Sequence, residues 1–86
     1  MTAWRQVYYQ AMKVIRKELS VNGNKHVKAN HRLMEDLGGT YIDVSAMIMA
    51  LNREFDIAIT DEESDNMVTV VNAINAVERH LKGSES

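Results

Sequence analysis

Apolar residues recur at steps of three and four in three parts of the chain, a spacing that places them on one face of an α-helix. The first series falls in residues 3–19, the second begins after residue 40, and the third begins after residue 69. A long polar connection, residues 20–39, separates the first series from the second. Acidic residues follow Thr60, and acids suit the first turn of a short helix between the second and third series. No part of the chain alternates as a strand would, so we predict an all-α fold with three longer helices and one short helix. The three series are Trp4, Val7, Tyr8, Ala11, Met12, Ile15, Leu19; then Val44, Ile48, Leu51, Phe55; then Val70, Ile74, Val77, Leu81.

Threonine residues mark the expected starts of the helices. Thr40 is followed by Asp43 and Thr60 by Glu63, and each pair has the spacing of a capping box. The remaining expected boundaries are Thr2 and Thr69 as N-caps of the first and last helices, and Gly83 as the end of the last helix.

The composition predicts one small domain that spans residues 1–86. Hydrophobic residues make up 45% of the chain, which is enough for one core and argues against disorder. Because cysteine is absent, the chain has no disulfide, no thiolate metal site and no cysteine nucleophile. No apolar stretch is long enough to cross a membrane and no secretory leader is recognisable, so we expect a cytoplasmic protein.

The formal net charge of −2 hides a division of charge along the chain. Residues 1–34 carry seven basic side chains and one acid, whereas residues 35–86 carry three basic side chains and eleven acids. Such an asymmetry can steer charged partners, although two solvated faces that merely differ would explain it equally well. The basic part lacks a recognisable nucleic-acid-binding module, so we expect no nucleic-acid partner.

Candidate catalytic and metal-binding residues are few. His26, His31 and His80 are isolated in the sequence, and a zinc site needs three or four ligands that converge. The acids in residues 61–65 lack the spacing of a calcium loop, and a solvated helix start explains them without a metal. No nucleophile can be paired with a base, so we expect that the protein is not an enzyme and binds no metal.

The most informative motif is Leu-Gly-Gly-Thr-Tyr-Ile-Asp at residues 37–43. It resembles the Leu-Gly-x-Asp-Ser-Leu-Asp motif of the acyl carrier protein family. The resemblance covers nearly the whole chain, and it implies a right-handed four-helix bundle with the prosthetic-group site at the start of the second helix. The downstream residues that match the family in register and without a gap are Glu54-Phe55-Asp56, Ile59, Asp61-Glu62-Glu63 and Thr69-Val70.

Tyr41 stands where the family has the serine that carries 4′-phosphopantetheine. A phenol oxygen lies several ångströms farther from the backbone than a serine oxygen, and small misplacements already cost large factors in rate. We therefore predict that phosphopantetheine, the family cofactor, is absent from this protein. Thr40 and Ser45 carry the nearest other hydroxyl groups. We interpret Thr40 as the N-cap of the second helix and Ser45 as an ordinary surface or boundary serine.

The second helix also has fewer acids than the docking helix of the family. Asp43 and Glu54 remain, whereas positions between them that are often acidic in the family hold Ala46, Asn52 and Arg53. Fewer carboxylates weaken the electrostatic attraction to basic enzymes. Loss of the attachment residue together with docking charge indicates that the carrier function has been relaxed.

These features favour a monomeric, non-enzymatic protein that works by protein binding, as a scaffold, decoy or regulator near a fatty-acid or polyketide-type pathway. The resemblance implies a carrier-dependent synthase or transferase as the partner. We predict Tyr41, Asp43 and Glu54 as the docking residues, because tyrosine supplies rigid contact area and the acids would contact basic groups.

Two alternatives remain open. The first is a functional carrier that is modified at Thr40 or Ser45. The second is a protein that binds an acyl ligand non-covalently inside the bundle. The chain has six methionines, expected mostly in or near the core, and methionine can line such a cavity or fill it. The residues expected to line such a cavity are Met47, Ile48, Leu51 and Val70.

Overall fold

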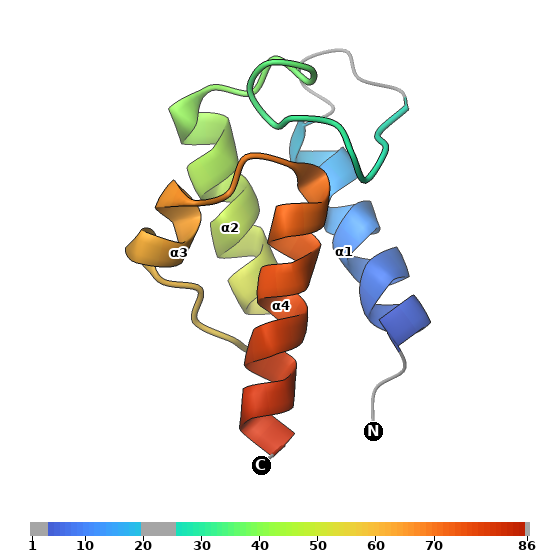
Figure 1. The fold of residues 1–86 in the computed structure, drawn as a ribbon, viewed down its shortest axis with the longest axis vertical. Coiled ribbons are helices and arrows are strands. Elements are labelled where there is room, and N and C mark those ends of the chain that lie inside the picture. The colour runs from blue at the N-terminus through green and yellow to red at the C-terminus, as the bar shows by residue number, and fades with distance from the viewer. Residues whose placement is uncertain (1–3, 20–25, 86) are drawn as a thin grey trace.

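The computed structural model describes residues 4–19 and 26–85, which form four α-helices (Figure 1). These helices are α1 (Trp4–Leu19), α2 (Tyr41–Phe55), α3 (Asp61–Asp65) and α4 (Val70–Glu85). The described residues contain no strand, only an isolated bridge between Arg32 and Thr69. The prediction of an all-α bundle with three longer helices and one short one is confirmed. The predicted N-cap Thr2 lies outside the described residues.

Both predicted capping boxes are present. The Thr40 hydroxyl accepts a hydrogen bond from the backbone N–H of Asp43 at 3.2 Å, and the Asp43 carboxylate accepts one from the N–H of Thr40 at 2.9 Å. Thr60 and Glu63 make the same reciprocal pair at the start of α3. Each box satisfies N–H groups that have no partner inside the helix, which explains why α2 and α3 begin where they do.

The ends of the last helix agree with the sequence only in part. Thr69 caps α4 as predicted, because its hydroxyl accepts a hydrogen bond from the N–H of Asn72 at 3.2 Å. The prediction that Gly83 ends α4 is wrong, since the helix continues to Glu85. A glycine ends a helix when it adopts a left-handed conformation, and Gly83 does not have a positive φ.

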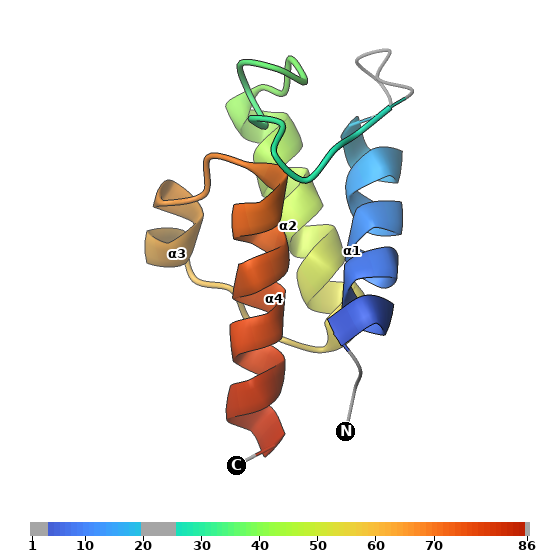
Figure 2. The ribbon, with the colours of Figure 1, turned by 45° about the vertical axis from the view of Figure 1, so that its right-hand side comes forward.

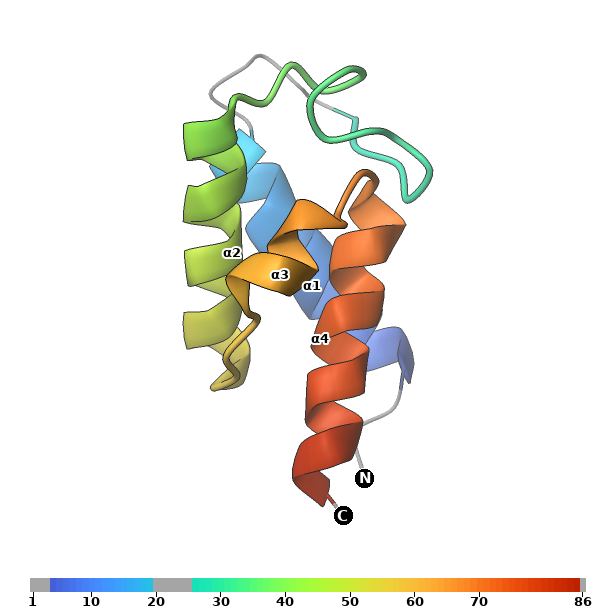
Figure 3. The same cartoon turned by 60° about the vertical axis from the view of Figure 1, so that its left-hand side comes forward.

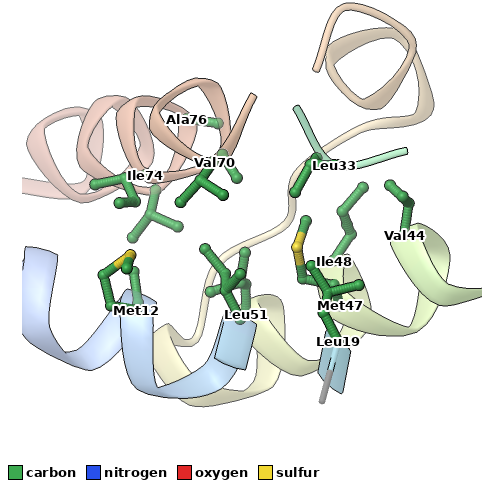
Figure 4. Packing of buried hydrophobic residues seen from close by; sticks show 14 of the residues in the cluster. Met12, Leu19, Leu33, Val44, Met47, Ile48, Leu51, Val70, Ile74 and Ala76 are labelled. Carbon is green, nitrogen blue, oxygen red and sulfur yellow. The ribbon is translucent and has the colours of Figure 1, made fainter. Parts of the chain in front are cut away.

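The core lies between α1, α2 and α4, which run side by side (Figure 2). It closes because each long helix turns one apolar face inward, as the spacing of the sequence predicts. Close-up, Leu51 of α2 lies among side chains of α1 and α4, and Leu33 contributes from the first loop (Figure 4). The largest fully buried side chains are Ile15, Leu19, Leu33, Met47, Leu51, Ile74, Val7, Val70 and Val77.

The connection between α1 and α2 is anchored to the start of α4. The N–H of Leu33 donates to the carbonyl of Val68 at 2.8 Å, and the N–H of Val70 donates to the carbonyl of His31 at 2.9 Å. A third backbone bond joins the N–H of Val71 to the carbonyl of Ala29 at 2.8 Å. These bonds fix the loop against α4 and thereby fix where α2 begins.

The methionines are divided between the core and the surface. Met12 and Met47 are buried and Met67 is half-buried, whereas Met34 and Met49 are 49% and 62% exposed. The expectation of positions in or near the core therefore holds for Met12, Met47 and Met67 and fails for Met34 and Met49. In the part of the chain that the structure describes, no helix combines the length and apolar character needed to cross a bilayer.

Candidate functional site

Tyr41 is the first residue of α2 and projects into solvent. Its side chain is 73% exposed, and the next side chain, Ile42, is 77% exposed. The capping box fixes the backbone here, because Thr40 and Asp43 bind each other's N–H groups on either side of Tyr41. The result is a rigid helix start that presents two large, solvent-exposed side chains.

The two neighbouring hydroxyl groups differ in their surroundings. The Thr40 oxygen is the cap acceptor for Asp43, which agrees with the interpretation of Thr40 as an N-cap. Ser45 is half-buried and faces a pocket that also contacts Tyr41. Ser45 is thus a boundary residue in the pocket wall, which agrees with the interpretation of it as a surface or boundary serine.

A pocket of about 330 Å³ opens beside Tyr41. Its lining comes from the first turns of α2, the first loop, the end of α3 and the segment that joins α3 to α4. Figure 3 shows the ribbon of these segments. Its apolar lining comes from Met34, Tyr41, Val44, Met67 and Val68, and its polar lining from Arg32, Glu35, Ser45, Ser64 and Asp65.

The cation at the loop side of this pocket, Arg32, is paired with acids of the same loop. Arg32 forms an ion pair with Glu35 and a second one with Asp36, whose Oδ2 lies 3.4 Å from the Arg32 Nε. The hydrogen bonds that Arg32 donates from its backbone and side chain lower the pKa of Asp36. Arg32 therefore forms its ion pairs within its own loop and is not a free cation for a ligand.

The alternative left open by the sequence, a cavity lined by Met47, Ile48, Leu51 and Val70, is contradicted by the structure. These side chains are at most 7% exposed and pack together in the core (Figure 4). The pocket beside Tyr41 shares none of them. Methionine fills the space at Met47 instead of lining a cavity.

The outward side of α2 carries a row of exposed residues that we call the α2 stripe: Ile42, Ala46 and Met49 are apolar, and Arg53 ends the row. Steps of four, three and four residues place them in one row along the helix. The stripe contains no carboxylate. Met34 and Val68, 49% and 54% exposed, add apolar surface at the pocket beside Tyr41.

The three predicted docking residues do not form one cluster. Tyr41 and Asp43 share the first turn of α2, but the Asp43 carboxylate is bound to the Thr40 N–H. Glu54 is exposed near the other end of the helix, about 20 Å from Tyr41 along the axis. Glu54 instead lines a groove together with Lys17 and Arg53.

Glu63 and His80 form a link between α3 and α4 that the sequence analysis missed. The Nε2 atom of His80 lies 2.9 Å from both carboxylate oxygens of Glu63, and Arg79 lies 3.8 Å away. Partial burial opposes ionisation of Glu63, but hydrogen bonds from His80 and Thr60 outweigh it and lower the pKa of Glu63. The interpretation of His80 as an isolated histidine is therefore wrong.

The other histidines take no part in this link. His26 is exposed, and the Nδ1 atom of His31 accepts a hydrogen bond from the N–H of Lys28 at 3.1 Å. Across residues 4–19 and 26–85, no three His, Asp or Glu side chains converge as a metal site would require.

Comparison with curated proteins finds a clear relative. The chain is 32% identical over 76 residues to the acyl carrier protein of Campylobacter lari, and the match covers 88% of this chain and 97% of that protein. A search against protein-family models finds no match.

Proposed function

Because the chain belongs to the acyl carrier protein family, we propose that it acts by binding a partner protein and does not carry an acyl group. In this proposal it keeps the helical bundle, lacks the phosphopantetheine arm, and serves as a scaffold, decoy or regulator. It performs no chemistry of its own. The partner is a carrier-dependent synthase or transferase, the class of protein that already recognises this fold.

The position of Tyr41 is the observation that carries the proposal. A transferase that attaches phosphopantetheine needs a short alcohol at the first turn of α2, and the residue there is an exposed phenol. The Thr40 hydroxyl is engaged as a cap and the Ser45 hydroxyl faces the pocket wall. These surroundings argue against either hydroxyl group serving as the attachment point in place of serine.

The α2 stripe supports binding as the remaining function. Tyr41 and Ile42 lie beside one another at one end, and Met49 continues the apolar row toward Arg53. A contiguous apolar surface with an exposed tyrosine is typical of protein interfaces. Because the stripe has no carboxylate, the proposal requires a partner surface that is apolar at this point.

Intact mass measurement tests the absence of the arm. The wild-type chain and the Tyr41→Ser variant are incubated with coenzyme A and a phosphopantetheinyl transferase of broad specificity. We expect the wild-type mass to stay unchanged and the variant to gain the arm, because the capped helix start is retained. Quantitative modification of the wild type would refute the proposal. Peptide mapping would then distinguish a carrier modified at Thr40 from one modified at Ser45.

Competition tests the binding role. An acyl-carrier-dependent transferase from the same cell is assayed with its own carrier while this protein is added in excess. We expect inhibition that Ile42→Asp or Met49→Asp abolishes, because each change places a carboxylate in the apolar row. Asn75→Asp, at an exposed position on α4, is the control and should inhibit like the wild type. Inhibition that survives both α2 changes would exclude the α2 stripe as the docking surface.

Non-covalent binding of an apolar ligand is a second candidate, favoured by the pocket beside Tyr41. Its volume lies at the lower end of the range usual for ligand pockets, and half of its lining residues are apolar. Titration with a medium-chain fatty acid, followed by NMR, should shift the signals of Val44, Met67 and Val68 if this pocket is used. Shifts confined to Met47 and Leu51 would indicate a ligand in the core instead.

A further inference from the structure

The outward face of α1 is not used by any site described above. Arg5, Tyr9, Lys13 and Arg16 follow one another at steps of four, four and three residues, so they form a single row on the helix. All four are exposed, and we call this row the α1 basic face. From Arg5 to Arg16 it is about 16 Å long.

The three cations of this face have no acidic partner nearby. Within the described residues, Arg5, Lys13 and Arg16 take part in no ion pair. The acid of α1, Glu18, is half-buried and lies in the groove toward Arg53 and Glu54 of α2. The exposed positions of the row therefore present positive charge that the molecule does not itself neutralise.

An aromatic residue stands inside this row of charge. Tyr9 is 69% exposed. Its ring meets Tyr8 edge-on at a centroid distance of 6.3 Å, and Tyr8 in turn lies 5.2 Å from Trp4. These contacts restrict the ring before any partner arrives. A pre-ordered tyrosine in a row with two arginines has the composition of a protein interface centre.

The acids of α3 lie on the other side of the bundle. α1 and α3 occupy opposite sides of the molecule (Figures 1 and 2), and Asp61, Glu62 and Asp65 of α3 are exposed. The overall charge of −2 disfavours a long polyanion such as nucleic acid. A compact acidic patch that covers α1 alone would meet only the cations.

A lipid surface fits this face less well than a protein does. Binding to an anionic bilayer needs several more basic residues or a row of inserted aliphatic side chains. The α1 basic face has three cations and no exposed aliphatic residue. Arginine, in contrast, binds carboxylates in a defined two-pronged geometry that rewards a structured acidic partner.

We propose that the α1 basic face is a second docking surface, and that it binds an acidic helical surface of a partner protein. Glutamate or aspartate side chains of that surface contact Arg5, Lys13 and Arg16, and an apolar side chain packs on Tyr9. The surface is separate from the α2 stripe, so one molecule can contact two partners. This inference does not depend on whether Tyr41 carries an arm.

Titration with a synthetic probe tests the proposal. The probe is a helical peptide with a row of glutamates and one leucine on the same face, and its control has glutamine in place of glutamate. Binding is followed by the fluorescence of Trp4, the single tryptophan, and by NMR shifts. We expect the glutamate peptide to shift the signals of Tyr9, Lys13 and Arg16, and added salt to weaken its binding.

Two lysine variants make the test specific. Lys13→Glu should weaken peptide binding about tenfold, because it replaces an attraction by a repulsion at the centre of the row. Lys28→Glu makes the same change in charge at an exposed loop position and should leave binding unaltered. Equal effects of the two variants would overturn the proposal, as would failure of the glutamate peptide to bind.

Two further probes separate the partner classes. A single-stranded oligothymidylate and phosphatidylserine-containing vesicles are titrated under the same salt conditions. Either one binding more tightly than the glutamate peptide would overturn the assignment to an acidic protein. Weaker binding of both, with the Lys13→Glu effect retained for the peptide, would support it.

Discussion

Replacing Glu63 by glutamine is expected to loosen α3 and lower the stability of the whole domain. α3 has five residues and buries none of its side chains, so apolar packing contributes little to its position. The Glu63 carboxylate instead accepts hydrogen bonds from the Thr60 N–H at 3.2 Å and from His80 at 2.9 Å. The Glu63→Gln change retains an oxygen for the cap but removes the charge that both bonds use.

The magnitude follows from these bonds and their exposure. A hydrogen bond to a charged group contributes about 1.5–3 kcal/mol when well shielded. The side chains of Glu63 and His80 are 26% and 27% exposed, so solvent weakens the pair. We therefore expect a loss of about 1–2 kcal/mol in the free energy of unfolding. For a domain of this size that corresponds to a fall in Tm of roughly 5–10 °C.

The pH dependence has a defined sign. Because the folded state lowers the pKa of Glu63 below its ordinary value of 4.5, the stabilisation is fully present above that pH. It is lost as the pH falls through the lower pKa of the folded state, where the carboxylate takes up a proton. The difference in stability between wild type and Glu63→Gln should thus be present above pH 4.5 and vanish in stronger acid.

Urea unfolding at a series of pH values measures this difference, and hydrogen exchange reports the opening of α3. Glu62→Gln is the matched control, since it makes the same chemical change one residue away at an exposed position. It should cost less than about 0.5 kcal/mol. If both variants lose the same stability, or if the Glu63→Gln deficit persists in strong acid, the reasoning about this link is wrong.

Four further substitutions test the fold. Thr40→Ala should cost about 1 kcal/mol, measured by urea unfolding, because the cap of α2 loses its acceptor; an unchanged midpoint would mean that the cap is not needed. Leu51→Ala should cost about 2–5 kcal/mol, because the side chain is fully buried, and a smaller loss would show that the core relaxes around it. Gly38→Ala should destabilise by about 1 kcal/mol because its φ is +70°, whereas Gly83→Ala should stabilise α4 by a similar amount. If thermal melts show that both glycine variants raise Tm, or that both lower it, that assignment is wrong.

The parts of the fold that depend on short spacing could be predicted from the sequence. The helical faces and the capping boxes at Thr40 and Thr60 involve residues three or four positions apart, so the pattern itself contains them. Gly83 is the exception. A glycine near the end of a helix can continue it or end it, and which one occurs depends on φ, which composition does not reveal.

The parts of the site that depend on distant residues could not be predicted. The pocket beside Tyr41 forms because backbone bonds hold Leu33 against Val68, and so bring Met34 near α2. Glu63 and His80 are seventeen residues apart and meet only because α3 folds back on α4. Helical periodicity identifies neighbours within one element, but it does not specify how loops return to the bundle.

Tyr41 projects from a capped helix start into water, and this has an evolutionary consequence. Little of its side chain packs against the domain, so exchanging it for serine should leave the folding equilibrium almost unaltered. A lineage can therefore change the chemistry of this position by one substitution, without compensating replacements in the interior.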